Sequence, residues 1–218
     1  MAKFKSGFVA IIGKTNVGKS TLINNLVGEK VAITVNKSQT TRTAIRAIVN
    51  RKNSQIIFID TPGIHKPTTK LGETMLETSY GIANDVDLIL YIVDCSKKEI
   101  TKGDRIILEK IKAINKKTIL VLNKIDLIDK EEILKVIDMY KNEYDFEAII
   151  PVSALSNKWN DTILDEIEKN LKEGPAYYDI DEYTDQTARQ LVEEVIREKA
   201  LKFLSEEVPH GIYIEVER

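Results

Sequence analysis

The stretch that decides the fold is Gly13-Lys14-Thr15-Asn16-Val17-Gly18-Lys19-Ser20-Thr21. It follows an apolar run at residues 8–12 and opens a segment, residues 21–26, in which apolar side chains recur at helical spacing. A Gly-x4-Gly-Lys-Ser pattern between a strand and a helix is typical of a phosphate-binding loop, or P-loop. Glycines let the backbone turn so that successive N–H groups, together with the helix N-terminus, face phosphate oxygens. We therefore predict a nucleotide site over this stretch, with Lys19 directed to the β and γ phosphates and Ser20 to Mg²⁺.

The composition is that of an ordinary globular protein. The 218 residues are 43% hydrophobic and 30% charged, which is typical of a soluble chain with room for one full domain. The single cysteine, Cys95, excludes an intramolecular disulfide, and no leader sequence or run of about 20 apolar residues is visible. We therefore expect a cytoplasmic protein. From Glu173 onward, 12 acidic and 5 basic residues give a net charge of −7, against +5 before it. This imbalance is too mild to indicate nucleic-acid binding by itself.

Two further motifs predict a magnesium ion beside the phosphates. The apolar run at residues 55–59 leads directly into Asp60-Thr61-Pro62-Gly63. A carboxylate at the end of a buried strand can hold Mg²⁺ through water, and the Gly63 N–H is then free to meet the γ-phosphate. The alternative is that Asp60 merely opens a turn. The pair Thr40 and Thr41 stands in a polar loop about twenty residues past the P-loop, where a second Mg²⁺ ligand belongs. Which of the two threonines ligates is left open.

The next motif selects the base. Residues 118–122 form an apolar run that ends in Asn123-Lys124-Ile125-Asp126. The Asp126 carboxylate can accept hydrogen bonds from guanine N1–H and N2–H₂, which adenine does not offer. A site built on such pairing rejects the analogue by orders of magnitude. Asn123 can bridge the base and the P-loop, while the Lys124 stem lies over the ring. These residues predict a site for GTP and GDP.

The order of elements predicts the fold class. Alternating strands and helices over residues 1–174 indicate an α/β protein with a doubly wound, mainly parallel, six-stranded sheet of the P-loop GTPase type. The last apolar run leads to Ser153 and Ala154, whose backbone N–H groups can meet guanine O6. Every motif follows a strand, and such sheets bind ligands at the carboxyl ends of their strands.

Residues 175–185 are acidic, aromatic and without periodicity, which predicts a linker. Residues 186–218 predict one helix followed by one strand at 211–217. Two such elements cannot bury a core of their own. We therefore expect that this segment either docks on the first domain or is the front part of a second, α+β unit of a longer protein.

Several stretches resemble the bacterial Era GTPases, and the resemblance covers essentially the whole chain. The stretches are Ser38-Gln39-Thr40-Thr41-Arg42, Asp60-Thr61-Pro62-Gly63-Ile64-His65, Gly174-Pro175-Ala176-Tyr177-Tyr178, Arg197-Glu198-Lys199 and Glu207-Val208-Pro209-His210. The resemblance implies a monomeric GTPase that acts in assembly of the small ribosomal subunit and associates peripherally with the inner face of the cell membrane. It also implies a C-terminal KH domain that binds the 3′ region of 16S ribosomal RNA.

Residues 186–218 resemble only the opening helix and strand of that KH domain. The basic Gly-x-x-Gly loop that clamps RNA in KH domains is absent from them. We therefore expect RNA binding by this chain to be weak or absent, although the full-length protein would bind.

The resemblance also bears on catalysis. In many GTPases a glutamine after Asp-x-x-Gly orients the attacking water, but here that position is the apolar Ile64. Asn16 occupies the P-loop position that ligates K⁺ in related GTPases with an apolar substitution, where carbonyls of the loop before Thr40 complete the ion's shell. The implied catalytic residues are Lys19, Asn16, Thr41 and Gly63, with slow hydrolysis stimulated by K⁺. The alternative is that Asn16 fills a tolerant loop position.

Two other functions share part of this pattern. A tRNA-modification or other septation-type GTPase carries the same nucleotide motifs, but the segment after Gly174 argues against it. A kinase or ATPase uses the same P-loop, and the Asn123–Asp126 motif disfavours it.

Overall fold

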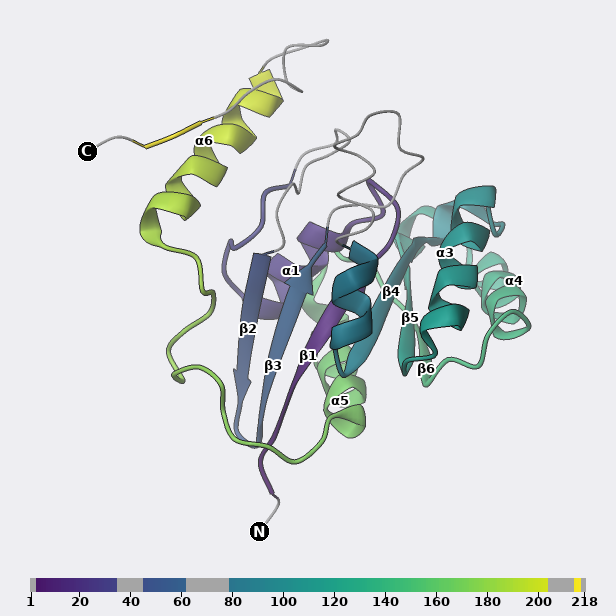
Figure 1. The fold of residues 1–218 in the computed structure, drawn as a ribbon. Coiled ribbons are helices and arrows are strands. Elements are labelled where there is room, and N and C mark those ends of the chain that lie inside the picture. The colour runs from purple at the N-terminus through teal and green to yellow at the C-terminus, as the bar shows by residue number, and fades with distance from the viewer. Residues whose placement is uncertain (1–2, 35–44, 62–78, 204–213, 217–218) are drawn as a thin grey trace.

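A six-stranded sheet forms the centre of the molecule (Figure 1). The computed structural model describes residues 3–34, 45–61, 79–203 and 214–216. The strands are β1 (Lys5–Ile12), β2 (Ile45–Arg51), β3 (Ser54–Asp60), β4 (Leu88–Asp94), β5 (Thr118–Asn123) and β6 (Ala148–Pro151). Their order is β2-β3-β1-β4-β5-β6, and β2 alone runs antiparallel to its neighbour. The predicted mainly parallel α/β sheet is confirmed.

Helices cover both faces of this sheet. They are α1 (Lys19–Val27), α3 (Lys102–Ile114), α4 (Lys130–Lys141), α5 (Asn160–Asn170) and the helical residues 79–85. A further helix, α6 (Ala188–Phe203), stands away from the sheet (Figure 1). Helices α1 and α5 contribute to the core on one face, while α3, α4 and residues 79–85 contribute to the core on the other. None of the helices in the described part of the chain is both long and apolar enough to span a bilayer.

The two cores follow from the period of a β-strand. Val9 and Ile11 of β1 join the core beneath α1 and α5, whereas Ala10 and Ile12 join the opposite one. Successive side chains of a strand point to opposite faces, so a strand covered on both sides must be apolar throughout. Strands β4 and β5 meet this demand, since they are buried along their length except at Asp94.

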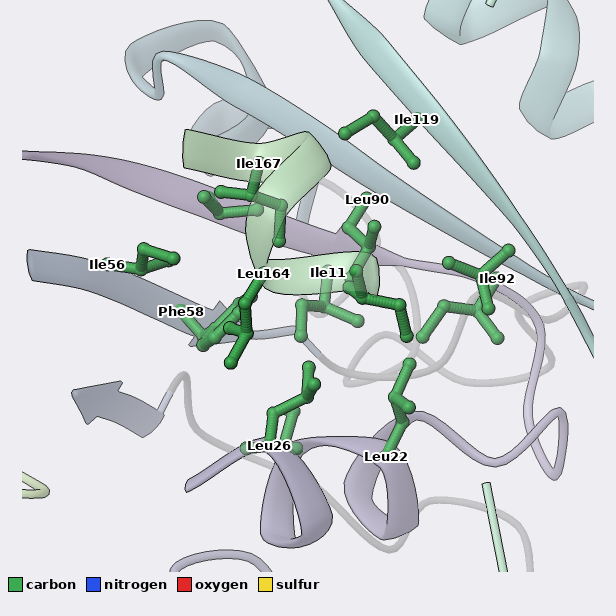
Figure 2. Packing of buried hydrophobic residues seen from close by; sticks show 14 of the residues in the cluster. Ile11, Leu22, Leu26, Ile56, Phe58, Leu90, Ile92, Ile119, Leu164 and Ile167 are labelled. Atoms are coloured by element: carbon green, nitrogen blue, oxygen red, sulfur yellow. The ribbon is translucent and has the colours of Figure 1, made fainter. Parts of the chain in front are cut away.

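Figure 2 shows one of these cores from close by. Leu22 and Leu26 lie four residues apart on α1 and point toward the sheet, where they face strand residues such as Ile11. Leu164 and Ile167 of α5 close the same cluster. The start of α1 is therefore packed against the strand that precedes the P-loop.

Two elements of the second half differ from the predictions. Helix α4 is not among the predicted elements, although its buried residues Val136 and Tyr140 show helical spacing. The strand predicted at 211–217 falls largely outside the described residues. Its described part, residues 214–216, forms no regular strand, and the Val216 N–H donates to the Glu193 carboxylate at 3.0 Å.

The segment predicted as a linker lies along the outer edge of β2 (Figure 1). The Ile48 N–H donates to the Tyr183 carbonyl at 2.9 Å. The buried amide of Gln55 accepts from the N–H groups of Tyr177 (2.7 Å) and Tyr178 (3.0 Å), and donates to the Tyr178 carbonyl (2.8 Å). Asn50 donates to two more carbonyls of the segment, those of residues 180 and 182. The side-chain amides of Asn50 and Gln55, in the hairpin formed by β2 and β3, thus hold a segment that lies more than a hundred residues further along the chain.

Replacing Gln55 with leucine should release this segment. The leucine fills the same space but leaves two backbone N–H groups and a carbonyl without their partner, at a cost of about 1–3 kcal/mol. We expect faster chymotryptic cleavage after Tyr177 and Tyr178 in Gln55→Leu, measured by mass spectrometry under native conditions. Lys52→Met, an exposed change in the same hairpin, is the control. Equal cleavage rates in both variants would show that Gln55 does not hold the segment.

Candidate nucleotide-binding site

The P-loop connects β1 to α1 in a conformation that requires glycine at two points. Gly18 has φ +100°, and a Cβ there would lie 2.2 Å from Nδ2 of Asn123. A Cβ on Gly13 would lie 2.4 Å from the carbonyl oxygen of Ile92 in β4. Asn16, at φ 62°, is also in the left-handed region and is exposed. The loop is therefore pressed against β4 and β5, and its tip faces outward.

Lys19 begins α1, and its ammonium is held by the loop itself. Its Nζ donates to the carbonyls of Gly13 (3.1 Å) and Lys14 (3.0 Å). Burial lowers the pKa of Lys19 to about 8, and the nearby charge of Asp60 opposes this shift. A phosphate group would add a negative charge beside this ammonium and favour its protonated form. The arrangement suits an anion at the N-terminus of α1.

The oxygen ligands predicted for Mg²⁺ meet beside this lysine. The Ser20 hydroxyl donates to Oδ2 of Asp60 at 3.1 Å, and Asp60 is fully buried at the end of β3. Thr61, also buried, donates to the Ile11 carbonyl at 2.5 Å and ties the end of β3 to β1. A hydroxyl and a carboxylate are ligands that Mg²⁺ accepts together with phosphate oxygens, so the residues present fit this ion.

Asn123 joins three loops of the site, and we call these contacts the Asn123 junction. Its Nδ2 donates to the Val17 carbonyl in the P-loop at 2.7 Å. Its Oδ1 accepts from the N–H groups of Lys124 and Ala154, both at 2.8 Å. Asn123 is itself buried, and its bonds with Val17 and Ala154 lie away from water. The predicted contact between Asn123 and the P-loop is present, and the loop after β6 joins it.

Two contacts at the predicted base site involve residues that the sequence did not single out. Lys124 pairs with Asp94 at 2.8 Å. Burial acts to raise the pKa of Asp94, but the hydrogen bonds from Lys124 and Ser96 and the charge of Lys124 together outweigh it, so the pKa lies below its ordinary value. Asn25 of α1 donates to the Ala154 carbonyl at 2.5 Å. An aspartate at the end of the apolar strand β4 is a signal that could have pointed to Asp94.

Asp126 lies in the short 3₁₀ helix Ile125–Leu127 and is exposed. The Ile125 N–H donates to the Val152 carbonyl at 3.2 Å, so the start of this turn is fixed to the end of β6. Ser153 and Ala154 follow and are buried. The carboxylate predicted to read guanine is thus carried on a turn anchored next to the loop predicted to meet O6.

The predicted site residues divide into two groups. The structure gathers Gly13, Lys14, Thr15, Asn16, Val17, Gly18, Lys19, Ser20, Thr21, Asp60, Thr61, Asn123, Lys124, Asp126, Ser153 and Ala154 at the carboxyl ends of the parallel strands. Thr40, Thr41, Pro62, Gly63 and Ile64 lie outside the described residues. The Lys14 side chain differs from its neighbours, because its ammonium contacts α3.

Comparisons with known proteins agree with this geometry. A family model described as a 50S ribosome-binding GTPase matches residues 8–124. The GTPase Era of Clostridioides difficile (strain 630) is 50% identical over 216 residues, which cover 99% of this chain and 72% of that protein.

Two solved structures superpose closely. One is Era in complex with MgGDPNP and nucleotides 1506–1542 of 16S ribosomal RNA, at 40% identity and a TM-score of 0.92. The other is an Aquifex aeolicus Era variant bound to GDP·AlF₄⁻, at 39% identity and a TM-score of 0.92. Each match covers 99% of this chain and 73% of the other. With the P-loop, the Ser20–Asp60 pair and the Asn123 junction in place, and with this likeness along nearly its full length, the chain belongs to the Era family of GTPases.

Proposed function

We propose that this protein binds guanine nucleotides with Mg²⁺, hydrolyses GTP, and acts in assembly of the small ribosomal subunit. The observation that carries the nucleotide part is the Asn123 junction, which fixes the P-loop, the Asp126 turn and the Ala154 loop around one space. The ribosomal part rests on the Era structure that contains 16S ribosomal RNA. The broad family model names the 50S subunit instead. It matches the nucleotide-binding part alone, so the likeness along the whole chain is the better guide.

The proposal gives a chemical role to each of the main side chains of the site. The Lys19 ammonium would meet the β and γ phosphates from its place beside the Gly13 and Lys14 carbonyls. Ser20 and Asp60 would hold Mg²⁺, which when bound neutralises charge on the phosphates. Thr41 and Gly63 are proposed to complete the site from segments outside the described residues. Asp126 accepts the guanine N–H groups, and Lys124, held by Asp94, covers the ring.

Asp126→Asn should exchange the base preference. The asparagine can donate to a carbonyl but cannot accept both guanine N–H groups, so GTP binding should weaken by at least about a hundredfold. Xanthosine triphosphate, which has a carbonyl in place of the guanine amino group, should bind better than GTP. Competition against a fluorescent GDP analogue measures both affinities, with ATP as a further competitor. Asp138→Asn, an exposed aspartate on α4, is the matched control. An unchanged GTP preference in Asp126→Asn would rule out this base contact, and tight ATP binding by the wild type would favour a kinase or ATPase.

Slow hydrolysis stimulated by K⁺ is the second part of the proposal. Asn16 carries an exposed amide on the P-loop tip, in a left-handed conformation that turns the backbone beside Lys19. A neutral amide oxygen, with backbone carbonyls of the loop before Thr40, makes a cage that suits K⁺ better than the smaller Na⁺. The bound cation would supply positive charge where Ile64 cannot orient water.

Initial GTP hydrolysis rates in equal concentrations of KCl and NaCl test this part. The wild type should be faster in KCl by about tenfold or more, the effect of one additional charge at the phosphates. Asn16→Ala should lose the difference, whereas Asn53→Ala, at the far end of the sheet, should keep it. Equal wild-type rates in the two salts, or K⁺ stimulation that survives Asn16→Ala, would remove K⁺ from the mechanism.

The C-terminal part is proposed to be the beginning of an RNA-binding unit. We divide the chain into a GTP-binding domain (1–174), a linker (175–185) and the N-terminal part of a KH-type domain (186–218). The exposed apolar residues Val192, Val195 and Phe203 on α6 suit a helix that packs against further chain. We also propose a cytoplasmic monomer with peripheral contact to the inner face of the membrane.

Binding of this 218-residue chain to an RNA of nucleotides 1506–1542 should be weak. The C-terminal segment is acidic and has no Gly-x-x-Gly loop, so what binding occurs should fall steeply with salt and match that of an unrelated RNA of equal length. Filter binding at low and near-physiological salt measures this. Tight, sequence-selective binding at the higher salt would place an RNA site within these residues.

A further inference from the structure

Lys14 lies within the P-loop, yet its side chain reaches the N-terminus of α3. Its Nζ donates to Thr101 Oγ1 at 2.7 Å and to Asp104 Oδ2 at 2.8 Å. The stem passes over the backbone of Gly103, where a Cβ would come within 2.9 Å of Lys14 Cδ. The contact therefore joins the loop after β1 to the start of a helix 90 residues further along the chain.

The Asp104 carboxylate is set in a fixed position. Its side chain is 4% exposed, against 23% for Lys14. It accepts from the Thr101 N–H (3.1 Å), the Thr101 hydroxyl (2.6 Å) and the Tyr91 hydroxyl (3.3 Å). The bond from the Thr101 N–H, together with the Asp104 N–H that donates to Thr101 Oγ1 at 3.4 Å, closes a capping box at the start of α3. A buried carboxylate needs a partner of opposite charge, and Lys14 is the cation paired with it among the described residues. The Lys14 ammonium is therefore paired with a carboxylate, which we call the anchor, that other hydrogen bonds hold in place.

The backbone of Lys14 connects this anchor to the nucleotide site. The Lys14 carbonyl accepts from Lys19 Nζ at 3.0 Å, beside the Gly13 carbonyl at 3.1 Å. Because the side chain of Lys14 is tied to α3, the position of its own carbonyl is restricted. The Lys14 carbonyl in turn fixes the position of the Lys19 ammonium.

We propose that Lys14 is a positioning residue of the nucleotide site. Paired with Asp104 and Thr101, it holds the Gly13–Lys14 backbone, and through it the Lys19 ammonium, in the place that the phosphates require. The inference rests on the proposed function, because it concerns the residue that would meet the β and γ phosphates. The side chain of Lys14 acts through Asp104 and makes no contact with the phosphates.

Four variants test this pairing by the dissociation constant of a fluorescent GDP analogue and by kcat and KM for GTP. Lys14→Met keeps the length of the stem and removes its charge. Asp104→Asn removes the partner's charge while retaining a side-chain oxygen that can accept from the Thr101 N–H in the capping box. Each should weaken GDP binding by about tenfold, the order of one charge-assisted hydrogen bond. The double variant should be no weaker than either single one. Lys14→Arg should restore affinity to within about twofold, because arginine also pairs with carboxylates.

Lys102→Met, which removes an exposed charge from the first turn of the same helix, is the control and should bind like the wild type. Normal GDP affinity in Asp104→Asn together with weakened Lys14→Met would mean that Lys14 touches the phosphates directly, and the proposal would be wrong. A lower urea midpoint in Lys14→Met with unchanged affinity would reduce the pair to a structural contact and also overturn it. A wild type that binds no guanine nucleotide would instead refute the proposed function itself.

Discussion

The side-chain amide of Asn123 is the contact on which the geometry of the site depends. It donates to the P-loop at Val17 and accepts from Lys124 and Ala154. An aspartate would lack the donor. The amide is buried, and a buried polar group left without a partner costs about 1–3 kcal/mol, so each of the three loops is stabilised by the other two. Gly18 permits this arrangement, because a Cβ there would occupy the place of the amide nitrogen.

The sheet supplies the frame that brings these loops into range. Parallel strands place their carboxyl ends at one edge, and β1, β3, β5 and β6 each end in a residue run that belongs to the site. Burial of β4 and β5 on both faces keeps their ends from shifting, since a slip of register would disrupt the close packing of both cores. The position of Lys19 at the start of α1 depends on the same core, through Leu22 and Leu26 (Figure 2).

Much of this could be predicted from the sequence, because the informative residues are close together along the chain. The P-loop, the Asn123–Asp126 motif and the apolar strands are local patterns, and they predicted the sheet and the family correctly. Contacts such as Lys124 with Asp94, or Lys14 with Asp104, join residues 30 and 90 positions apart. They depend on which loops the fold places side by side, so no local pattern reveals them. The buried residues of helix α4, Val136 and Tyr140, show helical spacing in the sequence, so this helix could be predicted. The docking of residues 175–185 could not, because it uses mostly backbone groups, which any sequence carries.

That docked segment has a consequence for the behaviour of the protein in solution. A sheet with an open outer strand offers a row of N–H and C=O groups to other molecules, and this is a route to aggregation. At one border the strand β6 is short and ends in Pro151, which limits such pairing. At the other border β2 is longer, but its Ile48 N–H already donates a hydrogen bond to the Tyr183 carbonyl. A GTP-binding domain shortened to end at Gly174 would lose this cover, and its solubility would suffer even though every nucleotide-binding residue remained.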